Sequence, residues 1–96
     1  MPTHDESEQF MREYFRLRDD QRRAFDRTVG MFFVDLRTRN FRASLRVKGV
    51  RGRPGVFELS WAPDGRAMWR YGTGPNPGDV HIFWLRIGTH DIFRDD

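Results

Sequence analysis

The feature that most constrains the fold is an alternation of apolar and polar side chains in three short stretches between Gly55 and His90. A period of two is typical of β-strands, because successive side chains of a strand point to opposite faces of the sheet. Pro63-Asp64-Gly65 separates the first two stretches and supplies residues that tolerate the positive φ of a hairpin turn. The pattern predicts three strands of an antiparallel meander: Val56–Trp61, Arg66–Tyr71 and Val80–Ile87.

The same alternation predicts one apolar and one charged face for this sheet. The apolar face is expected to carry Phe57, Leu59, Trp61, Ala67, Trp69, Tyr71, Phe83, Leu85 and Ile87. The opposite face is expected to present Glu58, Arg66, Arg70 and Arg86, together with Ile82 and Trp84. Trp84 has two interpretations, an exposed anchor for a partner protein or ordinary packing beneath a helix, and the second is favoured.

Two amphipathic helices are predicted before the sheet. The first begins at Glu8, ends near Leu17 and has an apolar face of Phe10, Tyr14 and Leu17. The second has Asp19 as its predicted N-cap, ends near Arg37 and has an apolar stripe of Phe25, Val29, Phe32, Phe33 and Leu36. Gly30 inside this helix costs roughly 1 kcal/mol relative to alanine, which a close contact with a helix or the sheet would explain.

The segment between the helices and the sheet is basic. Leu45-Arg46-Val47-Lys48 alternates apolar and basic side chains, which predicts a short edge strand or an extended lead-in with Arg46 and Lys48 on the same side. Arg51 and Arg53 follow in a loop that is rich in glycine and proline.

A chain of 96 residues is long enough for one core and too short for two. We therefore expect a single α+β domain, 1–96, in which a helical hairpin at 8–37 packs on a small, mostly antiparallel sheet of three to four strands at 44–90. The polar residues 1–6 are expected to be frayed.

Composition excludes several classes of protein. The absence of cysteine excludes disulfides, thiolate zinc sites and cysteine nucleophiles. No apolar run approaches the roughly 20 residues of a membrane span, and the polar start lacks the pattern of a signal peptide. These features favour a cytoplasmic protein without a membrane partner.

Basic residues are concentrated in the middle of the chain. The span 37–70 contains nine basic and two acidic residues, whereas 1–36 and 71–96 each contain two more acidic than basic residues. Lysine and arginine dominate contacts to phosphate, so this distribution favours a polyanion as the ligand. The alternative is a general drift towards arginine on a solvated surface, which does not explain the scarcity of acidic residues in this span.

Few side chains are candidates for catalysis. The histidines lack the tight spacing of zinc ligands, the glycines form no nucleotide-binding fingerprint and the serines have no nucleophile-elbow context, so no metal or cofactor is expected. His90 follows the third predicted strand. Arg66 and Arg70 are on the neighbouring predicted strand. An imidazole exchanges protons near neutral pH. It can act in phosphate chemistry when cations beside it stabilise the charge on phosphorus. Alternatively, His90 is an exposed residue at the end of a strand.

The run from Leu45 to Phe93 contains LRVKGVRGRPGVFELSWAPDGRAMWRYG and VHIFWLRIGTHDIF, and it resembles the RelE/ParE superfamily of bacterial toxins. In that superfamily a basic lead-in, a Gly-Val/Tyr-Phe/Tyr-Glu-Leu strand, an arginine-bearing strand and an Ile-Gly-Thr-His-type ending recur in this order. The resemblance implies a RelE-like fold and ribonuclease activity of the RelE kind. Such toxins cut mRNA, usually in the ribosomal A site, and are neutralised by an antitoxin from the same operon.

The resemblance also implies roles for individual residues. Arg66 matches the arginine that opens the family's third strand, and His90 matches the position of a catalytic histidine or arginine. The expected catalytic residues are His90, Arg66, Glu58 and Asp64, the last two as candidate proton acceptors; Glu58 could instead pair with a sheet arginine. The expected RNA-binding residues are Arg46, Lys48, Arg51, Arg53, Arg70, Arg86 and Phe93. The expected partners are a cognate antitoxin, mRNA and the ribosome.

Three features depart from the family pattern. Ser60 stands in a region where many members carry arginine, Phe93 replaces a tyrosine of several relatives and cannot transfer a proton, and no strand is apparent before Phe10. Two alternatives therefore stay open: a ParE-like protein that inhibits DNA gyrase, and a catalytically weak RNA-binding relative. His90 favours RNA cleavage, because ParE-like toxins generally lack the terminal histidine.

Overall fold

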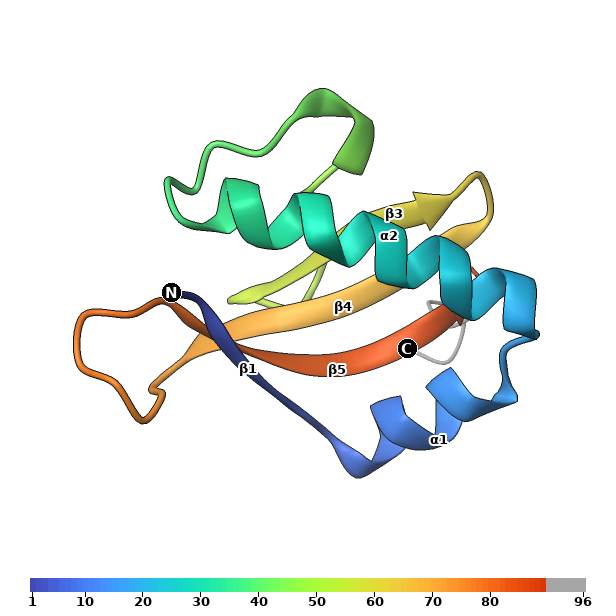
Figure 1. Cartoon of the computed structure of the whole chain (residues 1–96), viewed down its shortest axis with the longest axis horizontal. Helices are drawn as coiled ribbons and strands as arrows, with labels where there is room; N and C mark the ends of the chain where they lie inside the picture. The colour runs from blue at the N-terminus through green and yellow to red at the C-terminus, as the bar shows by residue number, and fades with distance from the viewer. Residues whose placement is uncertain (90–96) are drawn as a thin grey trace.

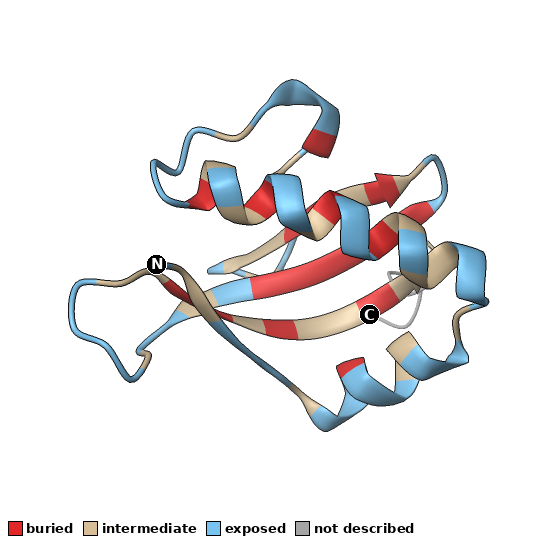
Figure 2. Ribbon diagram, in the orientation of Figure 1, coloured by how far each residue is buried: buried red, intermediate tan, exposed pale blue. Residues whose placement is uncertain are grey.

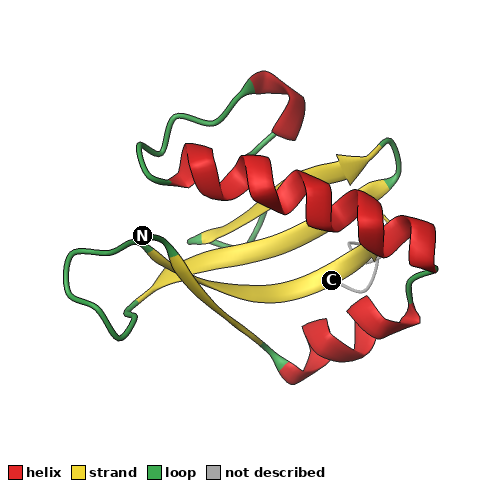
Figure 3. Ribbon diagram, viewed as in Figure 1, coloured by secondary structure: helices red, strands yellow, loops and turns green. Residues whose placement is uncertain are grey.

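Two helices pack on a five-stranded mixed sheet (Figures 1 and 3). The computed structural model describes residues 1–89. Its elements are β1 (Thr3–Glu6), α1 (Glu8–Arg16), α2 (Asp19–Leu36), the 3-10 turn η1 (Ala43–Leu45), β2 (Lys48–Gly49), β3 (Val56–Ala62), β4 (Gly65–Gly72) and β5 (His81–Thr89). The strand order is β1-β5-β4-β3-β2, with β1 parallel to β5 and all other neighbours antiparallel. The predicted α+β class is confirmed.

The additional strand comes from the N-terminus, so the prediction of a frayed segment at 1–6 is wrong. Thr3 to Glu6 pair with His81 to Trp84 and form the edge of the sheet. An edge strand is hydrogen-bonded on one side and faces solvent on the other, so it accepts polar and charged side chains that would be costly in a central strand. Polar composition was therefore a poor guide to order at this position.

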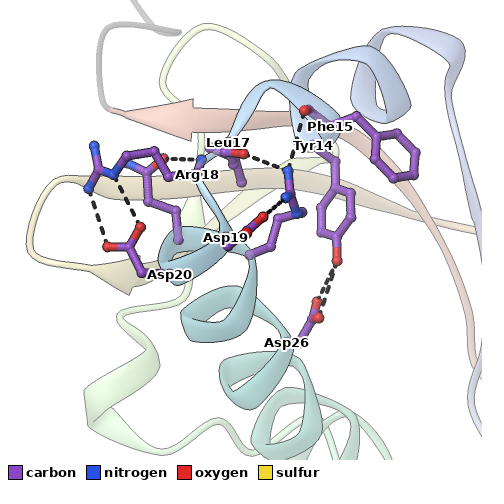
Figure 4. Close-up of polar contacts among 9 residues, drawn as sticks. Tyr14, Phe15, Leu17, Arg18, Asp19, Asp20 and Asp26 are labelled. Atoms are coloured by element: carbon purple, nitrogen blue, oxygen red, sulfur yellow. Dashed lines mark hydrogen bonds and ion pairs between the residues drawn. The ribbon is translucent and has the colours of Figure 1, made fainter.

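The helical hairpin forms close to the predicted limits, and Figure 4 shows polar contacts where its two helices meet. Ser7 caps α1, because its side-chain oxygen accepts a hydrogen bond from the backbone N–H of Phe10. The second helix begins one residue earlier than predicted: Arg18 occupies the N-cap position, and its backbone N–H donates to the side chain of Gln21 (2.9 Å). Tyr14 then donates to Asp26 (2.9 Å), which ties α1 to α2.

The core lies between the helices and the sheet (Figure 2), and Trp84 belongs to it. Phe10 of α1 and Phe25 and Phe32 of α2 all contact its ring, at centroid distances of 5.4–5.6 Å. Trp84 is 3% exposed. The favoured interpretation, packing beneath a helix, is confirmed, and Trp84 is no surface anchor.

The predicted faces of the third strand are wrong at four positions. Ile82 and Trp84 are buried, whereas Phe83 and Leu85 are half-buried. The pairing shows the cause: Trp69 lies opposite Trp84 and Met68 lies opposite Arg86, so Leu85 is an extra residue in a β-bulge. A bulge shifts the alternation by one residue. A sequence pattern of period two cannot detect such a shift in a strand where both faces are largely apolar.

The predicted lead-in from Leu45 to Lys48 is also different. Leu45 belongs to η1 and is buried, and Arg46 has a left-handed backbone (φ 51°). The strand is thus reduced to Lys48–Gly49, and Arg46 and Lys48 do not share one extended segment. Gly30 differs from its prediction too, because a Cβ at this position would meet no atom within 4 Å. No close contact requires this glycine.

No helix among residues 1–89 is long and apolar enough to span a membrane.

Candidate nucleic-acid interface

The face of the sheet opposite the helices carries an arginine in each of three cross-strand rows. Because directly paired residues share a face of a sheet, the register defines these rows. They are Val56–Arg70–Phe83, Glu58–Met68–Arg86 and Ser60–Arg66–Gly88. The predicted grouping of Glu58, Arg66, Arg70 and Arg86 on one face is therefore confirmed.

A hollow of about 310 Å³ lies at the outer edge of β3. Arg46 and Arg66 line it together with three hydroxyl side chains, those of Thr28, Ser44 and Ser60. Guanidinium and hydroxyl groups are the usual donors to phosphate oxygens. The hollow brings together two of the predicted functional arginines from segments that are 20 residues apart in the sequence, so it is the strongest candidate site among the described residues.

The Arg66 side chain is held in place by the turn between β3 and β4. Its Nη1 atom donates to the carbonyl oxygen of Gly65 (2.9 Å) and lies 3.4 Å from the carbonyl oxygens of both Ala62 and Pro63. A guanidinium has five N–H donors, and these contacts all use Nη1. The turn thus orients the group without consuming its full donor capacity.

The Arg46 side of the hollow depends on a loop that an ion pair fixes. Arg42 donates two side-chain hydrogen bonds and one backbone hydrogen bond to the carboxylate of Asp35 at the end of α2, at 2.8–2.9 Å. These hydrogen bonds lower the pKa of Asp35 to about 2. Because Ser44 and Arg46 follow directly, this contact positions one wall of the hollow.

Glu58 lies away from the hollow and pairs with Lys48 (3.3 Å). Its side chain is 10% exposed, whereas that of Lys48 is 71% exposed. Glu58 is therefore ion-paired, but the predicted partner was a sheet arginine and the observed partner is Lys48 of β2. As a candidate proton acceptor, Glu58 sits in the row next to Ser60 and Arg66.

Arg86 has a structural partner on α1. It donates to Glu13 (2.8 Å), and both side chains are 14% exposed. The second carboxylate oxygen of Glu13 accepts the backbone N–H of Ile87 (3.2 Å). This arrangement ties α1 to the edge of β5, which is a different use of Arg86 from the predicted contact with RNA.

Three other predicted RNA-binding residues lie on β4 and in the loop before β3. Arg53 reaches Met68 on the sheet, with its Nη1 atom 3.7 Å from the sulfur, and Arg51 is exposed in the preceding turn. The guanidinium of Arg70 lies 4.3 Å from the centre of the Phe83 ring. Asp64 is exposed in the turn between β3 and β4.

The two remaining predictions, His90 and Phe93, lie outside the described residues. The last described residue, Thr89, pairs with Gly65, and Gly88 pairs with Arg66. The described end of β5 is therefore adjacent to the turn that holds Arg66.

Sequence reasoning missed the hydroxyl groups of Thr28 and Ser44. Neither lies in a motif. Thr28 is inside the apolar stripe of α2, and Ser44 is in the 3-10 turn η1, which is followed by the left-handed backbone of Arg46. No signal in the sequence pairs them with Arg66.

Among residues 1–89, no group of three or more histidine, aspartate or glutamate side chains could hold a metal ion.

The fold is similar to that of known proteins, although the sequence matches none of them closely. No model of a protein family matches the sequence, and no curated protein matches it. Among solved structures, the chain is similar to one in the Escherichia coli DinJ–YafQ toxin–antitoxin complex, with a TM-score of 0.69 and 13% identity over 93% of this chain and 92% of that chain. The YoeB/ParE toxin from Agrobacterium tumefaciens gives a TM-score of 0.66 and 11% identity over 92% and 98%. The E. coli RelBE toxin–antitoxin complex gives 0.60 and 16% over 91% and 94%.

These similarities define a class of fold. The chain has the RelE-like toxin fold, as the resemblance of its second half predicted. At 11–16% identity the comparison concerns architecture, and activity has to be argued from the residues of this chain.

Proposed function

We propose that this protein is the toxin of a type II toxin–antitoxin system and acts as a metal-independent endoribonuclease on mRNA. One observation carries the proposal: Arg46 and Arg66 line a single hydroxyl-rich hollow at the edge of a sheet face that has an arginine in three of its cross-strand rows. The similarity of the fold to toxins that were solved with their antitoxins supports it. An mRNA target implies action in the cytoplasm, and the ribosome is the proposed place of cleavage.

In the proposed mechanism, the ribose 2′-oxygen attacks the adjacent phosphorus while a base accepts its proton. The bond from phosphorus to the 5′-oxygen breaks, and an acid protonates the leaving oxygen, which gives a 2′,3′-cyclic phosphate and a 5′-hydroxyl end. Arg66 stabilises the negative charge on the phosphate oxygens. The family resemblance assigns one proton transfer to His90, and Glu58 and Asp64 are the candidate groups for the other.

The proposed protein partner is a cognate antitoxin. The rows with Arg66 and Arg70, together with exposed Lys48 and Arg51, form a cationic surface that suits an acidic segment. An antitoxin bound there would block access of RNA to the hollow.

The test is cleavage of a short mRNA by the purified protein, with and without bacterial ribosomes, read by primer extension. We expect Arg66→Gln and His90→Ala to slow cleavage by about 10²–10³-fold. Arg23→Gln is a matched control, because Arg23 is an exposed arginine on α2. Wild-type rates in both variants, or the absence of cleavage by the wild type under both conditions, would rule out the proposal. Inhibition of gyrase supercoiling with intact RNA would favour the ParE-like alternative instead.

A further inference from the structure

The Phe83 ring on the charged face of the sheet is held in a fixed position. A Cβ atom at Gly72 would lie 2.0 Å from the ring, so the ring fits closely over a residue without a side chain. The buried imidazole of His81 meets the ring at 82°, with 4.8 Å between centroids. Phe83 is thus seated against the sheet, and its outward side supports another group.

That group is the guanidinium of Arg70, which lies 4.3 Å from the centre of the ring. Its Nη1 atom also donates to the carbonyl oxygen of Tyr71 (3.3 Å), so the ring and the backbone together restrict its orientation. Arg70 is exposed. A guanidinium is planar and weakly hydrated, and it stacks well on flat π-systems. The outward side of this one can accept a second flat partner.

The position of this stacked pair relates it to the hollow. Arg66 and Arg70 are four residues apart on the same face of β4, which corresponds to about 13 Å along a strand. Met68 lies between them and is buried, with Arg53 against its sulfur. A single strand of RNA whose phosphate occupies the hollow would have to follow this direction along β4 to reach Arg70.

We propose that the Arg70–Phe83 pair is a stacking site for an unpaired nucleobase next to the phosphate held by Arg46 and Arg66. This inference rests on the proposed function, since it names a second contact for the same RNA. Stacking on an aromatic or guanidinium plane is tolerant of base identity, so the site adds affinity and fixes the register of the strand.

A second arginine–aromatic pair, Arg39 and Tyr71, serves as a control. The guanidinium of Arg39 lies 4.4 Å from the centre of the Tyr71 ring, and Arg39 is exposed as well. Tyr71 pairs with Ile82, so this second pair lies on the helix side of the sheet, away from the charged face. If such pairs only stabilise the fold, substitutions in both pairs should have the same effect on RNA binding. If Arg70–Phe83 is a stacking site, only substitutions in that pair should weaken RNA binding.

The experiment measures binding of a single-stranded RNA that carries 2-aminopurine, whose fluorescence falls when the base stacks. Arg70→Lys keeps the charge and removes the plane, and Phe83→Leu removes the supporting ring. We expect both variants to weaken binding about 5- to 30-fold and to restore the fluorescence, while Arg70→Lys keeps the wild-type salt dependence. Arg39→Lys should stay within about twofold of wild type, as a surface substitution away from the RNA.

Three results would overturn the inference. The wild type could bind the RNA without any fall in 2-aminopurine fluorescence, Arg70→Lys could keep the wild-type affinity and quenching, or Arg39→Lys could lose as much affinity as Arg70→Lys. Loss of antitoxin binding in Arg70→Lys with unchanged RNA binding would assign the pair to a protein partner and would also overturn it. The proposed function fails separately, if the wild type does not cleave RNA. Thermal unfolding of Phe83→Leu checks its folding, and Arg70→Lys tests the proposal independently of that variant.

Discussion

The two edges of the sheet are treated differently by the fold. Beyond β1, the exposed edge of β5 is closed by α1: the backbone N–H of Ser7 donates to Trp84 (2.9 Å), its hydroxyl donates to Leu85 (2.9 Å), and Glu13 accepts from Ile87. At the other edge, β2 pairs with β3 only at Phe57 and Glu58, and the last residues of β3, Ser60 to Ala62, border the hollow. The edge beside α1 is called the closed edge below, and the edge beside the hollow the open edge.

Because of this difference, two arginines on the same face of the sheet have different roles. Arg86 at the closed edge has a half-buried carboxylate as partner, so its charge serves stability. Arg66 at the open edge is anchored by carbonyl oxygens, which orient it without neutralising its charge. A charged group that the fold orients but does not neutralise is available to an anionic ligand. Substitutions at the two edges should therefore separate stability from RNA binding.

The largest expected effect is at the closed edge. Glu13→Ala removes the partner of Arg86 and the acceptor for the Ile87 N–H, which should lower the free energy of unfolding by about 2–3 kcal/mol. Urea denaturation followed by tryptophan fluorescence measures this change. Glu13→Gln is the control: it keeps an acceptor for Ile87 and should lose less. A loss below about 0.5 kcal/mol in Glu13→Ala would show that α1 does not depend on this contact.

At the open edge the expected effect is on binding. Arg46→Gln should weaken RNA binding about fivefold, or about 1 kcal/mol, and should reduce the slope of log affinity against log salt by about 1. Stability should change by less than about 0.5 kcal/mol. Fluorescence anisotropy at several salt concentrations measures the binding. Arg12→Gln is the matched control, an exposed arginine on α1 at the closed edge. Equal losses in the two variants would mean that RNA responds to total charge and not to the hollow.

A smaller gain in stability is expected near β1. Gly30 borders a surface depression lined by Met1, His4 and Val34, and a Cβ there would be in open space. Gly30→Ala should raise the free energy of unfolding by about 0.5–1 kcal/mol, because alanine has the higher helix propensity and the lower unfolded-state entropy. Thermal unfolding measures the gain. An unchanged or lower midpoint would indicate that the helix needs this glycine for a reason other than packing.

The sequence predicted the fold class, both helices and three strands, because these depend on short-range periodicity. The face containing Arg66 and Arg70 was also predictable, since the turn at Pro63-Asp64-Gly65 fixes the register of β3 against β4. The faces of β5 were not predictable. The bulge at Leu85 depends on how β5 meets β4, and its own residues are apolar on both sides.

The hollow itself was beyond prediction from sequence. Its walls come from α2, η1 and the end of β3, and their meeting depends on the left-handed backbone at Arg46. A non-glycine residue in that conformation has no reliable sequence signature. The strand at Thr3–Glu6 was missed for a related reason: its order is conferred by pairing with a segment 78 residues away.

The last prediction concerns the loop that joins α2 to the open edge. Arg42 lowers the pKa of Asp35 in the folded protein to about 2, below its usual value, so the contact stabilises the fold fully above the unfolded-state pKa near 4. As the pH falls towards 2, Asp35 takes up a proton and this stabilisation is lost. Asp35→Asn should therefore lower the unfolding midpoint at pH 6, and the difference from wild type should shrink between about pH 4 and pH 2.

Thermal unfolding of both proteins across this range measures the difference, with Asp26→Asn as a second aspartate variant on the same helix. A constant difference at all pH values would mean that the loop is held by the hydrogen bonds alone and not by the charge of Asp35. In that case the wall of the hollow that carries Arg46 would not depend on an ion pair. The open edge would then owe its shape to packing, as the closed edge does in part through Phe10 and Trp84.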